Sequence, residues 1–164
     1  MDDYTETNDK SDPGDQDQLD SPVNENFIEK APLAFFLTDE NGQFIQANER
    51  ACEQLGYDRS ELLEQTVPTI SPSLDSVNDF RNQFDGLEPG ETHVFESTHQ
   101  TRTGREFPVQ IRAQKLSRDT NGYLQWWVRD LSESKERDRE LRKTRERLHT
   151  VIETAPLAIV GIDP

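Results

Sequence analysis

The feature that most constrains the fold of this chain is a short phrase that occurs twice. Residues 27–34 read FIEKAPLA, and residues 151–158 read VIETAPLA. The first copy runs on into a long stretch of patterned sequence, whereas the second is soon followed by Pro164. A repeat at so long an offset is typical of tandem domains and too long for a solenoid. We therefore expect the amino-terminal piece of a longer protein: one complete domain, then the truncated start of a second at residues 154–164.

The charge balance limits the possible partners. The chain has 33 acidic and 18 basic residues, which gives a net charge of -15. Such a surface repels nucleic acid and anionic membranes, so we expect neither as a partner. It resembles the surfaces of proteins from salt-loving archaea, where salt screens the self-repulsion; an ordinary acidic cytosolic protein is the alternative.

Two absences narrow the class of protein further. No segment approaches the roughly 20 apolar residues of a membrane span, and the start lacks the basic region of a signal peptide, so we expect a cytoplasmic protein. The single cysteine excludes an internal disulfide framework and a cysteine-based metal cluster.

The chain begins with a polar segment and then a hairpin. Residues 1–24 are acidic and polar with little to bury, which predicts a disordered tail. A short helix is expected from Asn26, ending at Ala31 because the following proline disfavours helical backbone there. Apolar residues at 33–38 and 44–47, separated by turn residues, predict a β-hairpin.

A helical insert follows the hairpin. Asn48 is a good N-cap, and Gly56 supplies the stop after three apolar residues at helical spacing, namely Ala51, Cys52 and Leu55. A second short helix is capped by Asp58 or Ser60. Two prolines argue against regular structure at residues 67–72, and residues 73–84 form a weak third helix.

The spacing of the apolar residues then changes from a helical period to a period of two. Residues 92–98, 107–113 and 123–128 have the pattern of strands, separated by turn sequences at 101–104 and 119–122. Two strands, a helical insert and three further strands predict an α+β fold with a five-stranded antiparallel sheet.

A long charged helix is expected after the last strand. Asp130 and Glu133 have the spacing of a capping box, and most residues at 133–153 favour helix. Leu141, Leu148 and Val151 lie at heptad-like spacing. A parallel two-stranded coiled coil and a solvated linker helix both explain this pattern.

These motifs, taken in order, resemble the PAS domain family. The residues that carry the likeness are Ala31-Pro32-Leu33-Ala34, Asn48 with Ala51, Leu55-Gly56-Tyr57, Ser60-Glu61-Leu62-Leu63, Thr103-Gly104 and Arg129-Asp130-Leu131-Ser132-Glu133. The last group is similar to the motif at which PAS domains pass to their output helix, with Leu131 and Ser132 as departures. The resemblance covers about residues 26–133, and the domain is expected at residues 25–132. It implies an antiparallel sheet with helices on one face around a small pocket, and sensing and dimerisation in signalling proteins, often sensor histidine kinases.

The expected pocket is small and carries no cofactor. Its expected residues are Phe36, Phe44, Asn48, Cys52, Leu55, Phe80, Ile111 and Trp126. A flavin photosensor of the light-oxygen-voltage type needs a reactive cysteine after the central insert, and a haem sensor needs a histidine within it; neither is present. We interpret Cys52 as a small buried residue and His93, His99 and His149 as surface residues, and we expect no metal site. The pocket is either packed with its own side chains or holds a small organic ligand.

Two groups of residues are expected to serve signalling. Asp130, Leu131 and Ser132 should pass a change in the sheet to the helix. Trp127 should lie on the outer sheet face, where it either anchors a partner or covers the amino-terminal helix of its own chain. Leu141 and Leu148 complete the expected homodimer contacts, through the helix flanking the domain and the linker coiled coil.

The function that follows is signal relay to downstream PAS or kinase domains. No nucleophile elbow, phosphate loop or zinc-ligand cluster occurs, so we expect no enzyme within these residues, and the catalytic part of a parent histidine kinase should lie beyond residue 164. The alternatives are a ligand-independent dimerisation or scaffold module, and the sensor part of a transcriptional regulator.

Overall fold

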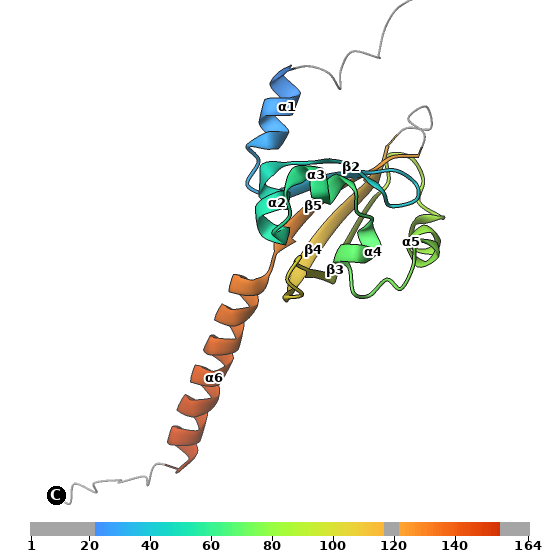
Figure 1. Ribbon diagram of the computed structural model, residues 1–164. Coiled ribbons are helices and arrows are strands. Elements are labelled where there is room, and N and C mark those ends of the chain that lie inside the picture. The colour runs from blue at the N-terminus through green and yellow to red at the C-terminus, as the bar shows by residue number, and fades with distance from the viewer. Residues whose placement is uncertain (1–21, 117–121, 155–164) are drawn as a thin grey trace, which may run out of the picture.

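The computed structural model describes residues 22–116 and 122–154, which form one sheet, a helical layer and a projecting helix (Figure 1). The strands are β1 (Ala34–Thr38), β2 (Phe44–Ala47), β3 (Thr92–Gln100), β4 (Glu106–Lys115) and β5 (Leu124–Asp130). The helices are α1 (Pro22–Glu29), α2 (Glu49–Leu55), α3 (Arg59–Leu63), α4 (Val67–Ile70), α5 (Val77–Phe84) and α6 (Ser132–Thr154).

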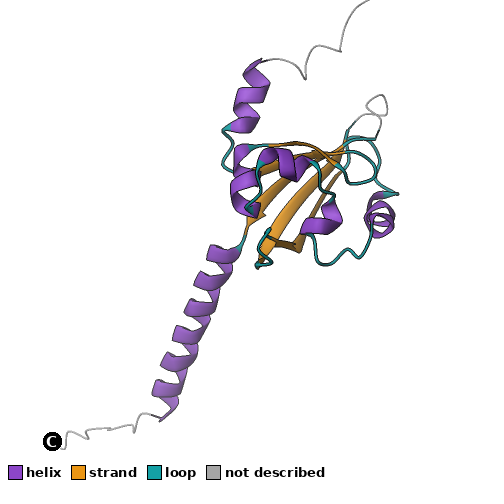
Figure 2. Cartoon of the chain, in the orientation of Figure 1, coloured by secondary structure: helices purple, strands orange, loops and turns teal. Residues whose placement is uncertain are grey.

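The five strands form one antiparallel sheet in the order β2-β1-β5-β4-β3. The first and last strands of the chain are therefore neighbours at its centre, with Ala34 opposite Val128. Helices α2 to α5 cover one face of the sheet, and α6 leaves the domain as an isolated rod (Figure 2). The predicted α+β fold with its antiparallel sheet and long final helix is confirmed. No helix in the described ranges is long and apolar enough to cross a membrane.

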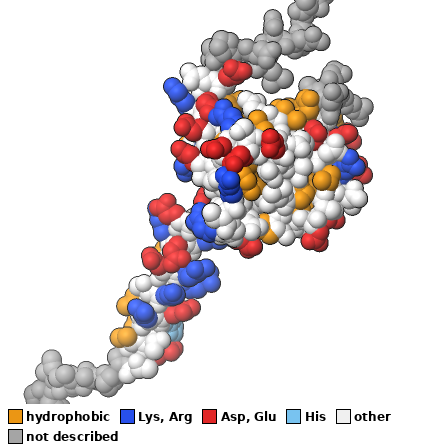
Figure 3. All heavy atoms as spheres, in the orientation of Figure 1, with side chains coloured by type: hydrophobic (Ala, Val, Ile, Leu, Met, Phe, Trp, Pro, Cys, Tyr) orange, Lys and Arg blue, Asp and Glu red, His pale blue; other side chains and the backbone are white. Residues whose placement is uncertain are grey.

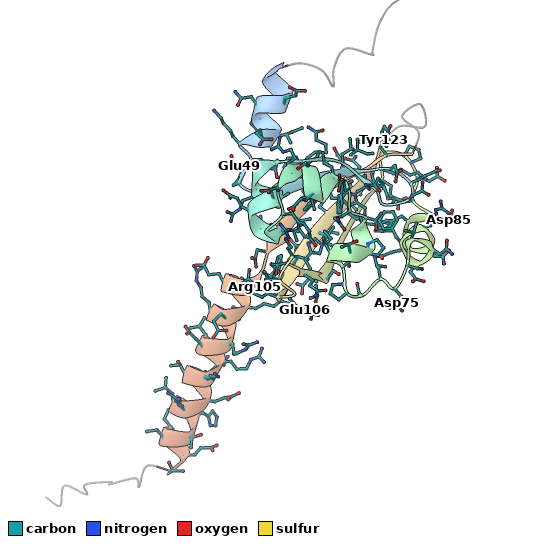
Figure 4. All side chains as sticks on the ribbon, viewed as in Figure 1. Glu49, Asp75, Asp85, Arg105, Glu106 and Tyr123 are labelled. Carbon is teal, nitrogen blue, oxygen red and sulfur yellow. The ribbon has the colours of Figure 1, made fainter. Side chains whose placement is uncertain are left out.

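The core lies between the sheet and the helical layer. Alternate residues of β4 and β5 are buried, because successive side chains of a strand point to opposite faces. Side chains gather in this layer, whereas Asp75 and Asp85, on either side of α5, point to solvent (Figure 4). The largest fully buried residues are Phe80, Leu55, Leu62, Ile70, Val109, Val128, Asn48 and Thr38.

The caps of the first helices are those predicted from sequence. The Asn48 side chain accepts a hydrogen bond from the Ala51 backbone N–H at the start of α2, and Gly56 ends this helix with φ of 75°. Asp58, rather than Ser60, caps α3 in a capping box with Glu61.

Several elements have bounds that differ from the sequence predictions. Helix α1 begins at Pro22, before the expected start at Asn26, so residues 22–24 are helical rather than disordered. Residues 67–70 form the one-turn helix α4, because Pro68 lies in the first turn, where a missing N–H breaks no helical hydrogen bond. Helix α5 begins at Val77, after the N-cap Ser76, and β3 continues to Gln100.

Three predictions fall outside the described residues. These are the tail at 1–21, most of the turn at 119–122, and the start of a second domain at 155–164.

Candidate functional site

A small cavity lies in the core between the sheet and the segment that joins α4 to α5. It offers about 30 Å³ to the centres of water molecules, and one water needs roughly 10–15 Å³ of such volume. Its polar lining residues are Ser71, Ser73, Gln83, Ser97 and His99. Its other lining residues are Phe36, Phe44, Val67, Ile70, Leu74, Phe84, Phe95, Ile111, Trp126 and Val128.

The structure divides the eight expected pocket residues into two groups. Phe36, Phe44, Ile111 and Trp126 line the cavity, and Asn48, Cys52, Leu55 and Phe80 do not. Phe80 packs over Gly42 instead, so closely that a Cβ atom on this glycine would lie 3.1 Å from the ring. Leu55 is fully buried in the main core, away from the cavity lining.

His99 is a buried cavity residue, and its prediction as a surface residue is wrong. Its exposed fraction is 4%. The predicted strand ended at Thr98, but β3 continues and pairs His99 with Phe107, whose side chain is in the core. Residues opposite each other in an antiparallel pair share one face, so the histidine ring points inward. His93, on the same strand, is half exposed as predicted.

The His99 ring has aromatic neighbours but an unpaired nitrogen. It meets Phe36 and Phe107 edge-on, at centroid distances of 6.5 and 6.1 Å. Its Nδ1 atom is buried and has no hydrogen-bond partner among the described residues. Burial lowers the pKa of His99 from 6.5 to about 4. The imidazole is therefore neutral at pH 7, with one donor and one acceptor nitrogen.

Hydroxyl groups also border the cavity. Ser71 is buried, and its Oγ lies 3.2 Å from Oγ of Ser73. Ser73 and Gln83 are exposed lining residues, so they mark the side from which solvent reaches the cavity. The site thus combines aromatic walls with hydroxyl, amide and imidazole groups.

The lining residues do not fit a flavin or a haem. The cavity volume corresponds to roughly two or three water-sized groups, and either ring system would displace much of the aromatic core. Cys52 lies outside the lining. Within the described residues, no group of three or more His, Cys, Asp or Glu side chains could hold a metal ion.

Asn48 joins three elements rather than lining the cavity. Its Oδ1 accepts hydrogen bonds from the backbone N–H groups of Phe35 and Ala51, both at 3.0 Å. Its Nδ2 donates to the carbonyl oxygens of Ile28 at 2.9 Å and Leu33 at 3.0 Å. Every hydrogen-bonding position of this buried amide is used, so Asn48 ties the end of α1 to β1 and α2.

Cys52 lies in the same region and is only partly buried. Burial raises the pKa of its thiol, while a hydrogen bond with Arg59 acts in the opposite direction. Arg59 also forms an ion pair with Glu29 of α1. This cluster fastens α1 to α2 and α3.

The junction between sheet and helix α6 is formed by the three residues expected there. The Leu131 N–H donates to the carbonyl oxygen of Pro108 on β4 at 2.9 Å. Asp130 Oδ1 accepts a hydrogen bond of 2.7 Å from the Ser132 N–H, which caps the helix start. One turn on, Lys135 Nζ lies 2.7 Å from Glu96 Oε2 of β3.

Trp127 lies on the outer sheet face, as its position in the strand predicts. It is opposite Phe35, and the two ring centroids are 4.9 Å apart. Phe35 is buried and Trp127 is partly exposed. The indole therefore covers an apolar residue of its own sheet and still presents part of its surface to solvent.

Helix α6 has no buried residue among its described positions, and acidic and basic side chains are interspersed along it (Figure 3). Leu141 and Leu148 are 68% and 59% exposed. Apolar side chains at this spacing on an otherwise charged helix form a stripe that nothing in the described chain covers.

The family to which this arrangement belongs is shown by comparison with known proteins. A family model for the PAS domain matches residues 32–133. The chain belongs to the PAS domain family, and the resemblance inferred from its motifs is confirmed. The described part is thus a PAS sensory module.

Two curated relatives of this chain are regulatory proteins. The nitrogen fixation regulatory protein of Klebsiella oxytoca is 26% identical over 139 residues, which are 83% of this chain and 28% of that protein. The protein of the same name from Klebsiella pneumoniae is 25% identical over the same shares. This chain therefore spans only about 28% of the length of these curated relatives.

Solved structures show the same fold. The PAS domain of an HTR-like protein from Haloarcula marismortui has a TM-score of 0.61 and 25% identity, over 66% of this chain and 88% of that one. A domain of a sensory box sensor histidine kinase/response regulator from Geobacter sulfurreducens has a TM-score of 0.56 and 26% identity, over 66% and 91% of the two chains.

Proposed function

We propose that this chain is the sensory and relay part of a multidomain two-component sensor histidine kinase in the cytoplasm. The cavity receives the signal, and α6 passes it to further PAS or kinase domains. Catalysis belongs to other parts of the protein. The observation that carries this proposal is that one strand, β3, contacts both ends of the route: Ser97 and His99 line the cavity, and Glu96 pairs with Lys135 of α6.

The alternation of β3 explains how a small change in the cavity reaches the helix. Ser97 and His99 point into the core, whereas the neighbouring Glu96 is exposed and pairs with α6. A shift of the strand therefore moves both faces together. Strand β5 continues into α6 with only Leu131 between them, so little motion is lost in a flexible loop.

The same proposal includes a homodimer. The exposed leucines of α6 suit the seam of a parallel coiled coil, and the exposed part of Trp127 suits contact with a flanking helix of the partner. The likeness to a PAS domain of a sensor histidine kinase/response regulator supports the kinase parent.

A regulator without kinase activity is the second candidate for the parent protein. The observation that favours it is the likeness to the nitrogen fixation regulatory proteins of two Klebsiella species, which extends over 83% of this chain. In that case the cavity and α6 keep the same roles, and the output is a regulatory contact.

The relay is tested by changing the phase of α6 in the full-length protein. Insertions of one to four residues after Lys135 rotate the rest of the helix by about 100° per residue, whereas seven residues restore the phase to within about 20°. We expect autophosphorylation to change most with one or two residues, less with four residues, which leave the helix about 40° from its original phase, and to return with seven. The seven-residue variant is the matched control, because it lengthens the helix most and rotates it least.

The alternatives give different results in the same experiment. A scaffold module tolerates all five insertions equally, and this outcome would overturn the relay. A regulator gives the periodic response in its regulatory output and shows no autophosphorylation, which keeps the relay and replaces the kinase parent.

A further inference from the structure

We propose that the cavity binds a neutral organic molecule of about two to four non-hydrogen atoms through a hydrogen bond between its hydroxyl or amide group and the imidazole of His99. The inference rests on the proposed sensing role and names the class of molecule that is sensed.

The unpaired nitrogen of His99 is the first observation. Buried polar groups in native proteins are nearly always hydrogen-bonded, because an unpaired one keeps its full desolvation cost. His99 is 4% exposed, and its Nδ1 has no partner among the described residues. The ring of this residue also lines the cavity, so a molecule bound there lies beside a histidine that has an unpaired nitrogen.

The chemistry of the walls selects a neutral molecule. The lining residues in the described part of the chain include no Asp, Glu, Lys or Arg. An ion placed there would lose its hydration without gaining an opposite charge, which is costly in an apolar interior. His99 does not supply a positive charge for an anion, because burial disfavours its protonated form.

The polar groups around the cavity suit a hydroxyl or a primary amide. Each serine hydroxyl can donate or accept, and a neutral imidazole offers one donor and one acceptor. Ser97 and His99 lie on the same face of β3, and Ser71 lies among the lining residues from the helical layer. A ligand group that both donates and accepts can therefore satisfy the histidine and a serine together.

The volume and the aromatic walls set the size of the molecule. About 30 Å³ is open to the centres of water molecules, enough for roughly two or three water-sized groups. Phe36, Phe84 and Trp126 provide apolar contact for a short hydrocarbon part. Short-chain alcohols and simple amides have these properties.

The experiment uses the full 164-residue chain with three probes of similar size: ethanol, acetamide and acetate. Long-range ¹H–¹⁵N spectra of the histidine rings follow the nitrogens of His99 directly during each titration. We expect ethanol or acetamide to shift the His99 ring nitrogens with saturation at a dissociation constant of about 1–10 mM, as suits so few atoms. Acetate should cause no saturable shift.

Two variants locate the binding. His99→Phe keeps an aromatic ring of similar size but removes both nitrogens, and we expect it to weaken the binding of the alcohol or amide at least about tenfold. His93→Phe is the matched control, because His93 is on the same strand, is half exposed and is absent from the cavity lining. It should bind the probes as the unmodified chain does. In these variants, binding is followed by the backbone amides of Ser71 and Ser97.

Three outcomes would overturn the inference. These are stronger binding of acetate than of the neutral probes, equal binding by the His99→Phe and unmodified chains, and no saturable shift with any probe, which means that water alone pairs with His99. None of them bears on the insertions in α6, which test the relay separately.

Discussion

Trp126 Nε1 donates a hydrogen bond of 2.9 Å to Thr38 Oγ1, and both side chains are buried. The two residues lie on the central neighbouring strands β5 and β1. Trp126 also lines the cavity, so this bond fixes an indole that forms part of the cavity wall. The bond therefore holds the Trp126 side chain in one rotamer, on the strand that leads into α6.

Replacing Thr38 tests the contribution of this bond. Thr38→Val keeps the shape of the side chain and leaves the indole N–H buried without a partner, so we expect a loss of about 1–3 kcal/mol in the free energy of unfolding. Urea denaturation followed by tryptophan fluorescence measures it. Thr38→Ser retains the hydroxyl and should lose less; a larger loss in Thr38→Ser than in Thr38→Val would show that the methyl group, not the bond, matters.

Replacing Asn48 tests the connection between α1, β1 and α2. Asn48→Asp is nearly isosteric, but it replaces the two N–H donors of Nδ2 with a carboxylate oxygen, an acceptor that would face the carbonyl oxygens of Ile28 and Leu33. We expect a loss of about 2–4 kcal/mol in unfolding free energy at pH 7. Asn78→Asp, an exposed change in the first turn of α5, is the control and should be close to neutral. Similar losses in both variants would contradict the role of Asn48.

The buried His99 predicts a dependence of stability on pH. Its pKa is lowered from 6.5 to about 4 in the folded state, so between these values the unfolded chain binds more protons. Stability is therefore complete above about pH 6.5 and falls as the pH is lowered toward 4, by roughly 3 kcal/mol for this residue.

Comparison with His99→Phe isolates this residue from the carboxylates that titrate in the same range. We expect the variant to be at least as stable as the unmodified chain at pH 7, and the difference between them to grow by roughly 3 kcal/mol as the pH falls to 4. Urea denaturation at each pH provides the values. A difference that does not change with pH, or that changes as much in His93→Phe, would contradict the burial of His99.

The ion pair between Glu96 and Lys135 should matter little for stability and more for the start of α6. Both side chains are about half exposed, and such pairs contribute about 0.2–1 kcal/mol. A double-mutant cycle of Glu96→Gln and Lys135→Ala should give this coupling in low salt and almost none in 1 M NaCl. Hydrogen exchange should accelerate in the first turn of α6 in Lys135→Ala. Arg139→Ala, which breaks a pair within α6, is the control and should leave that turn unchanged.

The leucines of α6 predict the oligomeric state. If they form the seam of a dimer, Leu141→Ala with Leu148→Ala should raise the dimer dissociation constant at least about tenfold, because each removes buried methyl groups. Arg142→Ala with His149→Ala changes the next residues along the helix, which point about 100° away, and is the control. Sedimentation equilibrium distinguishes the cases; a monomeric unmodified chain would contradict the coiled coil.

The sheet could be predicted because its strands carry a period of two and turn residues separate them. Phe107, Val109, Ile111 and Ala113 fixed one buried face of β4, and all four are buried. His99 could have been placed by the same reasoning, since the turn at 101–104 brings it opposite Phe107. A strand that ends at Thr98 leaves out this pairing, so the sequence prediction places His99 at the surface.

The cavity could be predicted only in part. Four of its residues lie on strands or strand ends whose inward side follows from alternation, namely Phe36, Phe44, Ile111 and Trp126. The lining residues from α4, α5 and the segment between them depend on how these helices pack on β3, and packing of helices on a sheet is decided by side-chain shape rather than by period. Phe80 is an example. Its helical spacing predicts burial, which is correct, but its ring packs over Gly42 and does not line the cavity.

The length of α6 gives the domain a lever. The helix has 23 residues, which at 1.5 Å per residue extend it about 34 Å beyond the sheet. A ligand of a few atoms can displace a strand by only a fraction of an ångström, and such a shift at the base acts close to the pivot at Leu131. A tilt of about 5° there carries the far end of the helix through about 3 Å. In the proposed relay, the exposed single rod would convert a motion too small to rearrange a core into one large enough to change contacts between the proposed downstream domains.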